Sequence, residues 1–161
     1  MTTPRSMRWS VLPALALLAA CGDKEAEDTS EPGVYLMTDM DRDGYPIGVD
    51  CDDAEVLLVA YGISARAARS AVRKAREKGI KAGLFRPITL WPFPESAFRK
   101  AAAKASSVLV PEMNAGQLCL EIERLRPDGA KVISMPRIDG EPIAPVDIED
   151  KIASLVKKGK K

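Results

Sequence analysis

From residue 54 onward, the sequence repeats one unit in which a short apolar run is followed by an amphipathic segment. The first run, Glu55 to Tyr61, reads EVLLVAY and ends at Gly62, which is typical of a strand buried on both faces. Similar runs follow at residues 81–86, 107–110 and 131–135. Strands that alternate with helices predict an α/β fold, with an open, mainly parallel sheet and helices on both faces.

The segments between the apolar runs have the spacing of surface helices. We expect one helix from Ser64, as its N-cap, to about Lys78, and others from Pro94, over residues 115–125 and from about Pro145. The residues expected to face the core are Ala68, Ala71, Val72, Ala75, Phe98, Ala101, Ala102, Ala105, Leu118, Ile122, Leu125, Ile148, Ile152 and Leu155.

The first of these helices has a basic outer face. Its cationic side chains are Arg66, Arg69, Arg73, Lys74 and Arg76. No aromatic residues are interleaved with them, which favours a solvated face over a nucleic-acid-binding one.

Charge divides the chain near Asp53. Residues 22–53 contain eleven acids and two bases, a net charge of −9, whereas residues 54–161 contain twenty bases and twelve acids, a net charge of +8. An asymmetry of this size indicates a domain boundary. We therefore expect a linker at residues 22–53, one α/β domain at residues 54–157, and a short basic tail at residues 158–161.

The composition also excludes several kinds of chemistry. The chain has no histidine, so imidazole catalysis and histidine-ligated zinc are excluded. Its three cysteines, Cys21, Cys51 and Cys119, form no CxxC pair, so neither a zinc site nor an iron–sulfur cluster is indicated.

Residues 1–21 have the layout of a secretory signal. Two arginines precede an apolar run at residues 11–20 that is too short to span a bilayer as a stable helix. The run ends in LAAC, which resembles a bacterial lipobox; the resemblance implies that Cys21 is acylated and anchors the mature protein to a membrane. The alternative is a buried apolar helix that happens to end at Cys21.

The linker that follows is polar, and its first part has almost no apolar residues, as expected of a disordered tether. Further along, Asp39, Asp41 and Asp43 precede a glycine and match the start of an EF-hand-type calcium loop. Asp50 is at the twelfth position, where such loops usually have glutamate. A site for a hard cation such as calcium is one interpretation; a solvated acidic linker that binds divalent ions only weakly is the other.

Three separated motifs in the α/β region carry a family resemblance. They are AEVLLVAYG at residues 54–62, GLFRPITLWPFP at residues 83–94, and VLVPEMNAGQL at residues 108–118. In this order and spacing they resemble the transketolase C-terminal-like domain that closes the alpha subunit of 2-oxoacid:ferredoxin oxidoreductases, most closely the 2-oxoglutarate branch. The resemblance covers about 100 residues.

The resemblance implies a role in a multi-subunit enzyme that decarboxylates a 2-oxoacid, forms an acyl-CoA and passes electrons to ferredoxin. In such assemblies thiamine diphosphate and iron–sulfur clusters are held by other parts, including a beta subunit, and the subunits self-associate. The family's thiamine-contacting glutamate and cluster cysteines have no counterpart here. We therefore assign no catalytic residue and expect this chain alone to bind neither cofactor.

Five residues in the motifs are candidates for a partner interface. Trp91 and Phe93 lie between prolines and are expected to pack against the sheet edge or a partner subunit. Glu112, Asn114 and Gln117 surround a predicted helix N-terminus at the end of a strand, where open α/β sheets place their ligands. They either face a partner subunit or an anion, or only cap the helix; Asn114 and Gln117 have capping-box spacing.

The two parts of the chain indicate different compartments. The signal and acidic loop indicate a membrane-anchored lipoprotein, whereas the α/β domain resembles part of a cytoplasmic enzyme. The first hypothesis is an assembly domain of the oxidoreductase alpha subunit. The second is a lipid-anchored calcium-binding surface protein, and the third a chimeric sequence with no coherent function.

Overall fold

The computed structural model describes residues 48–159, which form a five-stranded sheet and four helices. In chain order the elements are β1 (Gly48–Val49), β2 (Val56–Val59), α1 (Gly62–Glu77), β3 (Ala82–Phe85), α2 (Glu95–Ala102), β4 (Ser107–Glu112), α3 (Gln117–Leu125), β5 (Lys131–Pro136) and α4 (Pro145–Gly159). Among these helices, none is both long enough and apolar enough to cross a membrane.

The strand order in the sheet is β1-β3-β2-β4-β5. The strands from β2 to β5 are parallel, and β1 adds one short antiparallel edge by pairing with β3. The predicted open, mainly parallel sheet is confirmed. The central strand β2 is buried along its whole length, as its continuous apolar sequence predicts.

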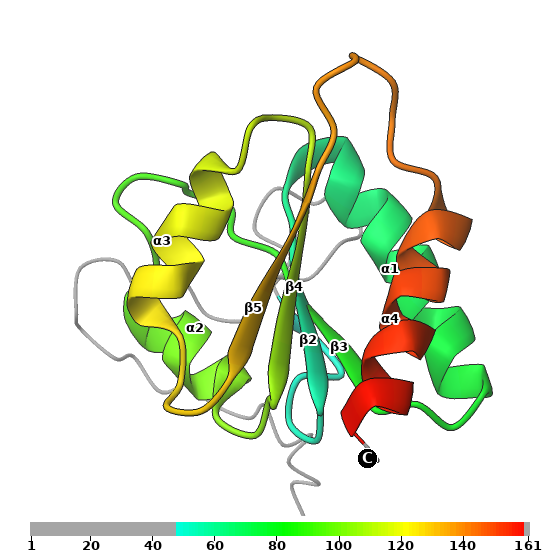
Figure 1. Cartoon of the computed structure of the whole chain (residues 1–161). Coiled ribbons are helices and arrows are strands. Elements are labelled where there is room, and N and C mark those ends of the chain that lie inside the picture. The colour runs from blue at the N-terminus through cyan, green and yellow to red at the C-terminus, as the bar shows by residue number, and fades with distance from the viewer. Residues whose placement is uncertain (1–47, 160–161) are drawn as a thin grey trace, which may run out of the picture.

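Helices cover both faces of the sheet, with α1 and α4 on one side and α2 and α3 on the other (Figure 1). The sheet therefore has two hydrophobic layers. One is rich in alanine beneath α1, and the other contains the aromatic rings of Phe85, Phe93 and Phe98. The residues predicted to face the core are buried, apart from Leu155, which is partly buried.

The folded unit begins before the charge boundary at Asp53. Gly48 and Val49 form β1 opposite Phe85 and Leu84. Cys51 is 5% exposed, and its thiol donates to the carbonyl oxygen of Leu84 at 3.2 Å. Residues assigned to the linker from their charge therefore complete the edge of the sheet.

Two helix starts differ from the prediction. The first helix begins at Gly62 with Tyr61 as N-cap, so Ser64 is not its cap but a buried residue of its first turn. Helix α3 begins at Gln117 rather than at residue 115, because Gly116 adopts a left-handed conformation with φ of 102°. Helix propensity alone does not locate such a turn.

Candidate functional site

The parallel strands all end at one edge of the sheet, which we call the carboxyl edge. The connections from β2 to α1, β3 to α2, β4 to α3 and β5 to α4 all begin there, and each following helix starts there. Loops and helix N-termini at this edge are where open α/β sheets place their binding sites.

Glu112, the last residue of β4, is 1% exposed and lies under the first turn of α3. Its two carboxylate oxygens accept hydrogen bonds from the backbone amides of Leu118 at 2.9 Å and Cys119 at 3.1 Å. These amides lack partners within the helix, and the helix dipole favours a negative charge at this end. Glu112 therefore acts as a buried cap, which supports the capping interpretation rather than contact with a partner.

Asn114 joins the ends of two neighbouring strands. Its Oδ1 accepts hydrogen bonds from the amides of Gly116 at 2.8 Å and Gln117 at 3.2 Å, and its Nδ2 donates to the hydroxyl of Tyr61 at 2.9 Å. Tyr61 follows β2 and Asn114 follows β4, so this contact links the N-termini of α1 and α3. Capping was one of the two roles that the sequence left open for Asn114, and the contact with Tyr61 was not predicted.

The loop after β3 places its two aromatic residues in opposite environments. Phe93 is 7% exposed, and its ring centroid lies 6.3 Å from that of Phe85 and 5.9 Å from that of Phe98. It packs against the sheet and has little surface left for a partner. Trp91 is 86% exposed, and the Trp91–Pro92 peptide is cis.

Trp91 belongs to a larger group of exposed apolar side chains. Among the side chains that the structure describes, the exposed large hydrophobic ones are Ile63, Ile88, Leu90, Trp91, Leu120, Ile138 and Val146. Each lies in a loop that leaves the carboxyl edge or in the first turn of the helix that follows. We call this set the apolar rim. Its confinement to one edge distinguishes it from the scattered exposed residues of an ordinary surface.

A shallow cavity of about 270 Å³ lies at the apolar rim. It is lined by Tyr61, Leu90, Trp91, Phe93, Gln117, Leu118 and Glu121. The cavity thus brings together Trp91, Phe93 and Gln117 of the five predicted interface residues, while Glu112 lies beneath the first turn of α3. Sequence reasoning missed Leu90 and Leu120, although apolar residues in the connection after a predicted strand are a usable signal.

Of the four proposed calcium ligands, Asp50 is the one within the described residues, and its carboxylate forms an ion pair with Arg76. A carboxylate oxygen of Asp50 lies 3.4 Å from Nε of Arg76, and Asp39, Asp41 and Asp43 lie outside the described residues. Within residues 48–159, no three cysteine, aspartate or glutamate side chains converge on a point that a metal ion could occupy. Cys21, the predicted lipidation site, also lies outside this range.

Both described cysteines are buried and not paired in a disulfide. Burial raises the pKa of the Cys51 thiol to about 11, and the pKa of the Cys119 thiol is also raised, chiefly by burial. Because the thiolate is the reactive and metal-binding form, these two side chains serve as packing residues of the core.

Residues 54–148 match the family described as pyruvate:ferredoxin oxidoreductase core domain II. The 2-oxoglutarate synthase subunit KorA of Methanothermobacter marburgensis is 39% identical over 104 residues, which are 65% of this chain and 28% of that protein. The ketoisovalerate oxidoreductase subunit VorB of Methanothermobacter thermautotrophicus is 45% identical over 104 residues, 65% of this chain and 29% of that protein.

A solved structure shows the same arrangement. The 2-oxoglutarate:ferredoxin oxidoreductase from Magnetococcus marinus, with 2-oxoglutarate, coenzyme A and succinyl-CoA bound, superposes with a TM-score of 0.57 at 26% identity. The match covers 63% of this chain and 18% of that one. The chain thus spans less than a third of the length of each of these proteins.

Proposed function

The chain belongs to the pyruvate:ferredoxin oxidoreductase core domain II family, and from this premise we propose that its α/β domain is a non-catalytic assembly domain of a 2-oxoacid:ferredoxin oxidoreductase. The assembled enzyme would convert a 2-oxoacid to an acyl-CoA and pass electrons to ferredoxin. The choice of 2-oxoacid stays open, because the identity to a ketoisovalerate enzyme subunit is no lower than the identity to a 2-oxoglutarate one.

The apolar rim is the observation that carries this proposal. Trp91 is 86% exposed and Leu120 is 69% exposed, so a domain alone in water would leave these side chains solvated. A partner that covered them would gain about 25 cal/mol for each Å² of apolar surface removed from water. Exposed tryptophans beside a shallow apolar cavity are frequent anchors of protein interfaces.

We propose the beta subunit of the oxidoreductase as the partner that covers the apolar rim. The buried carboxylate of Glu112 and the Asn114–Tyr61 hydrogen bond would keep the first turns of α1 and α3 in fixed positions beneath it. In this arrangement the domain supplies a rigid docking surface, and other parts of the enzyme hold thiamine diphosphate and the iron–sulfur clusters.

Co-expression with the beta subunit of the same organism tests this docking. We expect the two to co-purify, and Trp91→Ala to weaken binding by about 2 kcal/mol or more, which is roughly 30-fold in Kd. Lys104→Ala, an exposed change at the opposite end of the domain, is the control and should bind normally. Equal binding of the Trp91→Ala variant and the unaltered chain would refute docking through the apolar rim.

We also propose that the N-terminal segment anchors the chain to a membrane through acylated Cys21. The LAAC sequence after an apolar run supports this proposal. Intact mass measurement after expression in bacteria tests it: cleavage before Cys21 with added acyl mass is the expected result. An uncleaved, soluble chain would remove the anchor and favour a cytoplasmic location.

Calcium binding by the acidic loop is a separate proposal that rests on Asp39, Asp41, Asp43 and Asp50. Calcium would have to compete with Arg76 for the carboxylate of Asp50, because the two groups form an ion pair. Isothermal titration with calcium in low salt tests it, with Asp41→Asn expected to abolish any heat of binding. A heat that survives this change would place the cation elsewhere.

A further inference from the structure

The cavity at the apolar rim, which we call the rim cavity, has aromatic walls and one charged side chain. Three of its seven lining residues are aromatic, Tyr61, Trp91 and Phe93, and the one that carries a charge is Glu121. Trp91 is 86% exposed, so most of its indole surface is open to a ligand. A cation is attracted to the face of an aromatic ring, and most strongly to that of tryptophan. The rim cavity therefore combines two features that favour a cationic ligand.

Glu121 belongs to an ion-pair cluster with an excess of negative charge. Nη2 of Arg124 lies 2.6 Å from a carboxylate oxygen of Glu121 and 2.5 Å from a carboxylate oxygen of Glu95. The hydrogen bond from Arg124 lowers the pKa of Glu121, so this carboxylate is ionised at neutral pH. Two carboxylates thus share one guanidinium, which leaves a net charge of −1 on the cluster. An apolar ligand would remove part of this charge from water without balancing it.

The volume of the rim cavity limits what it can hold. At about 270 Å³ it is smaller than the pockets of about 300–1,000 Å³ that bind drug-sized ligands. A single side chain of a partner protein is therefore the better match. Arginine suits the walls, because its planar guanidinium stacks on aromatic rings and forms paired hydrogen bonds with carboxylates. Gln117, which also lines the cavity, offers a further acceptor oxygen.

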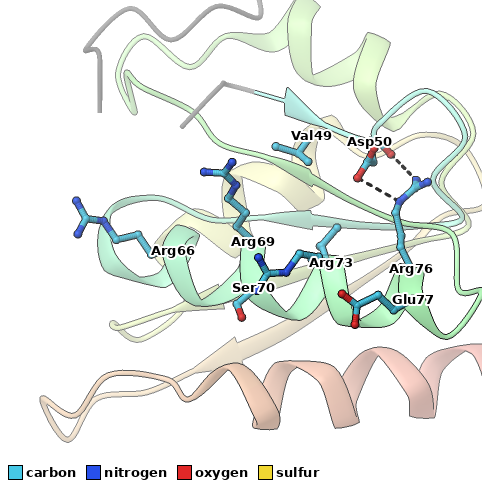
Figure 2. A pocket seen from close by; sticks show the side chains of 9 residues that line it. Val49, Asp50, Arg66, Arg69, Ser70, Arg73, Arg76 and Glu77 are labelled. Carbon is cyan, nitrogen blue, oxygen red and sulfur yellow. Dashed lines mark hydrogen bonds and ion pairs between the residues drawn. The ribbon is translucent and has the colours of Figure 1, made fainter. Parts of the chain in front are cut away.

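Another hollow of the domain, along α1, has the opposite character (Figure 2). A carboxylate oxygen of Asp50 lies 3.4 Å from Nε of Arg76, so a guanidinium of the chain itself is already paired there. Among the described residues that line this hollow, four arginines accompany two carboxylates, and no aromatic ring is present. A ligand that carries a guanidinium should therefore prefer the rim cavity.

We propose that the rim cavity binds an arginine side chain of the beta subunit, with its guanidinium between the indole of Trp91 and the carboxylate of Glu121. This inference rests on the proposed docking of the beta subunit and adds the kind of residue that the partner must supply. It also gives the ion pairs of Arg124 a role, because they hold the carboxylate of Glu121 in place at the wall of the cavity.

Titration with a small probe tests this chemistry without the beta subunit. The full-length chain is titrated with Nα-acetylarginine amide, and the indole N–H signal of Trp91 is followed by NMR. Trp91→Leu identifies this signal, because Trp9 is the other tryptophan. We expect the arginine probe to bind at least about fivefold more tightly than Nα-acetylcitrulline amide at the same ionic strength. Citrulline has the same shape as arginine without its charge.

Affinity for the beta subunit tests the same contact in the complex. Glu121→Gln should weaken binding about fivefold or more and make the affinity less dependent on salt. Glu123→Gln is the matched control and should bind normally, because Glu123 is exposed on the same helix and does not line the cavity. Trp91→Leu keeps an apolar side chain without a ring, and should weaken binding nearly as much as Trp91→Ala. Circular dichroism confirms that each variant is folded.

Two results would overturn the inference and leave the proposed docking standing. One is equal binding of the arginine and citrulline probes. The other is a complex with the beta subunit that is weakened by Trp91→Ala but not by Glu121→Gln, since the cavity would then take an apolar side chain. Selective binding of the arginine probe by a chain that binds no beta subunit would instead refute the docking and support the arginine site.

Discussion

At the scale of single residues, the buried carboxylate of Glu112 holds the first turn of α3 against the end of β4. It is 1% exposed and accepts two backbone hydrogen bonds from the start of α3. We predict that Glu112→Gln destabilises the domain by about 1–3 kcal/mol, because the amide NH₂ cannot accept a hydrogen bond and leaves one buried amide unpaired. Urea unfolding followed by circular dichroism measures the change.

Glu123→Gln is the control for this prediction. Glu123 is exposed on the same helix, so the identical change of chemistry should alter the free energy of unfolding by less than about 0.5 kcal/mol. If both variants unfold at the same urea concentration as the unaltered chain, the two hydrogen bonds of Glu112 contribute nothing measurable.

At the scale of elements, the edge strand β1 depends on a glycine in its neighbour. A Cβ atom at Gly83 would lie 2.7 Å from the carbonyl oxygen of Asp50 and 2.9 Å from Cβ of Ala54. We predict that Gly83→Ala displaces β1 and costs about 1–3 kcal/mol, because the backbone on the other side must move. Hydrogen exchange should show faster exchange at Val49, while β4 and β5 keep their protection.

The same substitution at Gly129 provides a contrast. A Cβ there meets no atom within 4 Å, although the φ of 79° makes alanine unfavourable. Gly129→Ala should therefore lower stability slightly and leave exchange at β1 unchanged. Faster exchange at Val49 in this variant as well would mean that β1 is sensitive to the stability of the whole domain and does not depend specifically on close packing against Gly83.

At the scale of the whole molecule, α4 is joined to α1 by charge as well as by apolar packing. The carboxylate of Glu149 pairs with Lys78 and lies 3.9 Å from Nζ of Lys74. Lys78, and secondly Lys74, lower the pKa of Glu149 below its ordinary value of 4.5. The pKa values of Asp53, Glu121 and Asp139 are lowered too, chiefly by hydrogen bonds to Arg76, to Arg124 and to the amide of Glu141 respectively.

These shifts predict how stability depends on pH. A carboxyl group whose pKa is lower in the folded state contributes stability that is fully present above the unfolded-state pKa and is lost as the pH falls through the folded-state pKa. The melting temperature should therefore decrease as the pH is lowered below about 4.5. In Glu149→Gln this acid-induced fall should be smaller; an identical fall would show that the α1–α4 ion pairs are not linked to folding.

The alternation of strands and helices and the residues of the two core layers can be predicted from the amino-acid sequence alone. Both follow from local periodicity. The side chains of a continuous apolar run such as residues 56–59 point to both faces of the sheet, so both faces must be buried. In α1, alanines at helical spacing all lie on one face, which is therefore the inner face. The role of Asn114 as a cap was also predictable, because its side chain reaches amides only two and three residues away.

Contacts between residues that are distant in the sequence depend on the folded arrangement of the elements. The charge pattern separated residues 48–53 from the domain, yet β1 pairs with β3, because strand pairing depends on a partner more than 30 residues away. The same holds for the Tyr61–Asn114 contact, for the burial of Phe93 beside the exposure of Trp91, and for the gathering of the apolar rim at one edge. Local sequence fixes the elements, whereas the crossover connections of a parallel sheet bring their ends together.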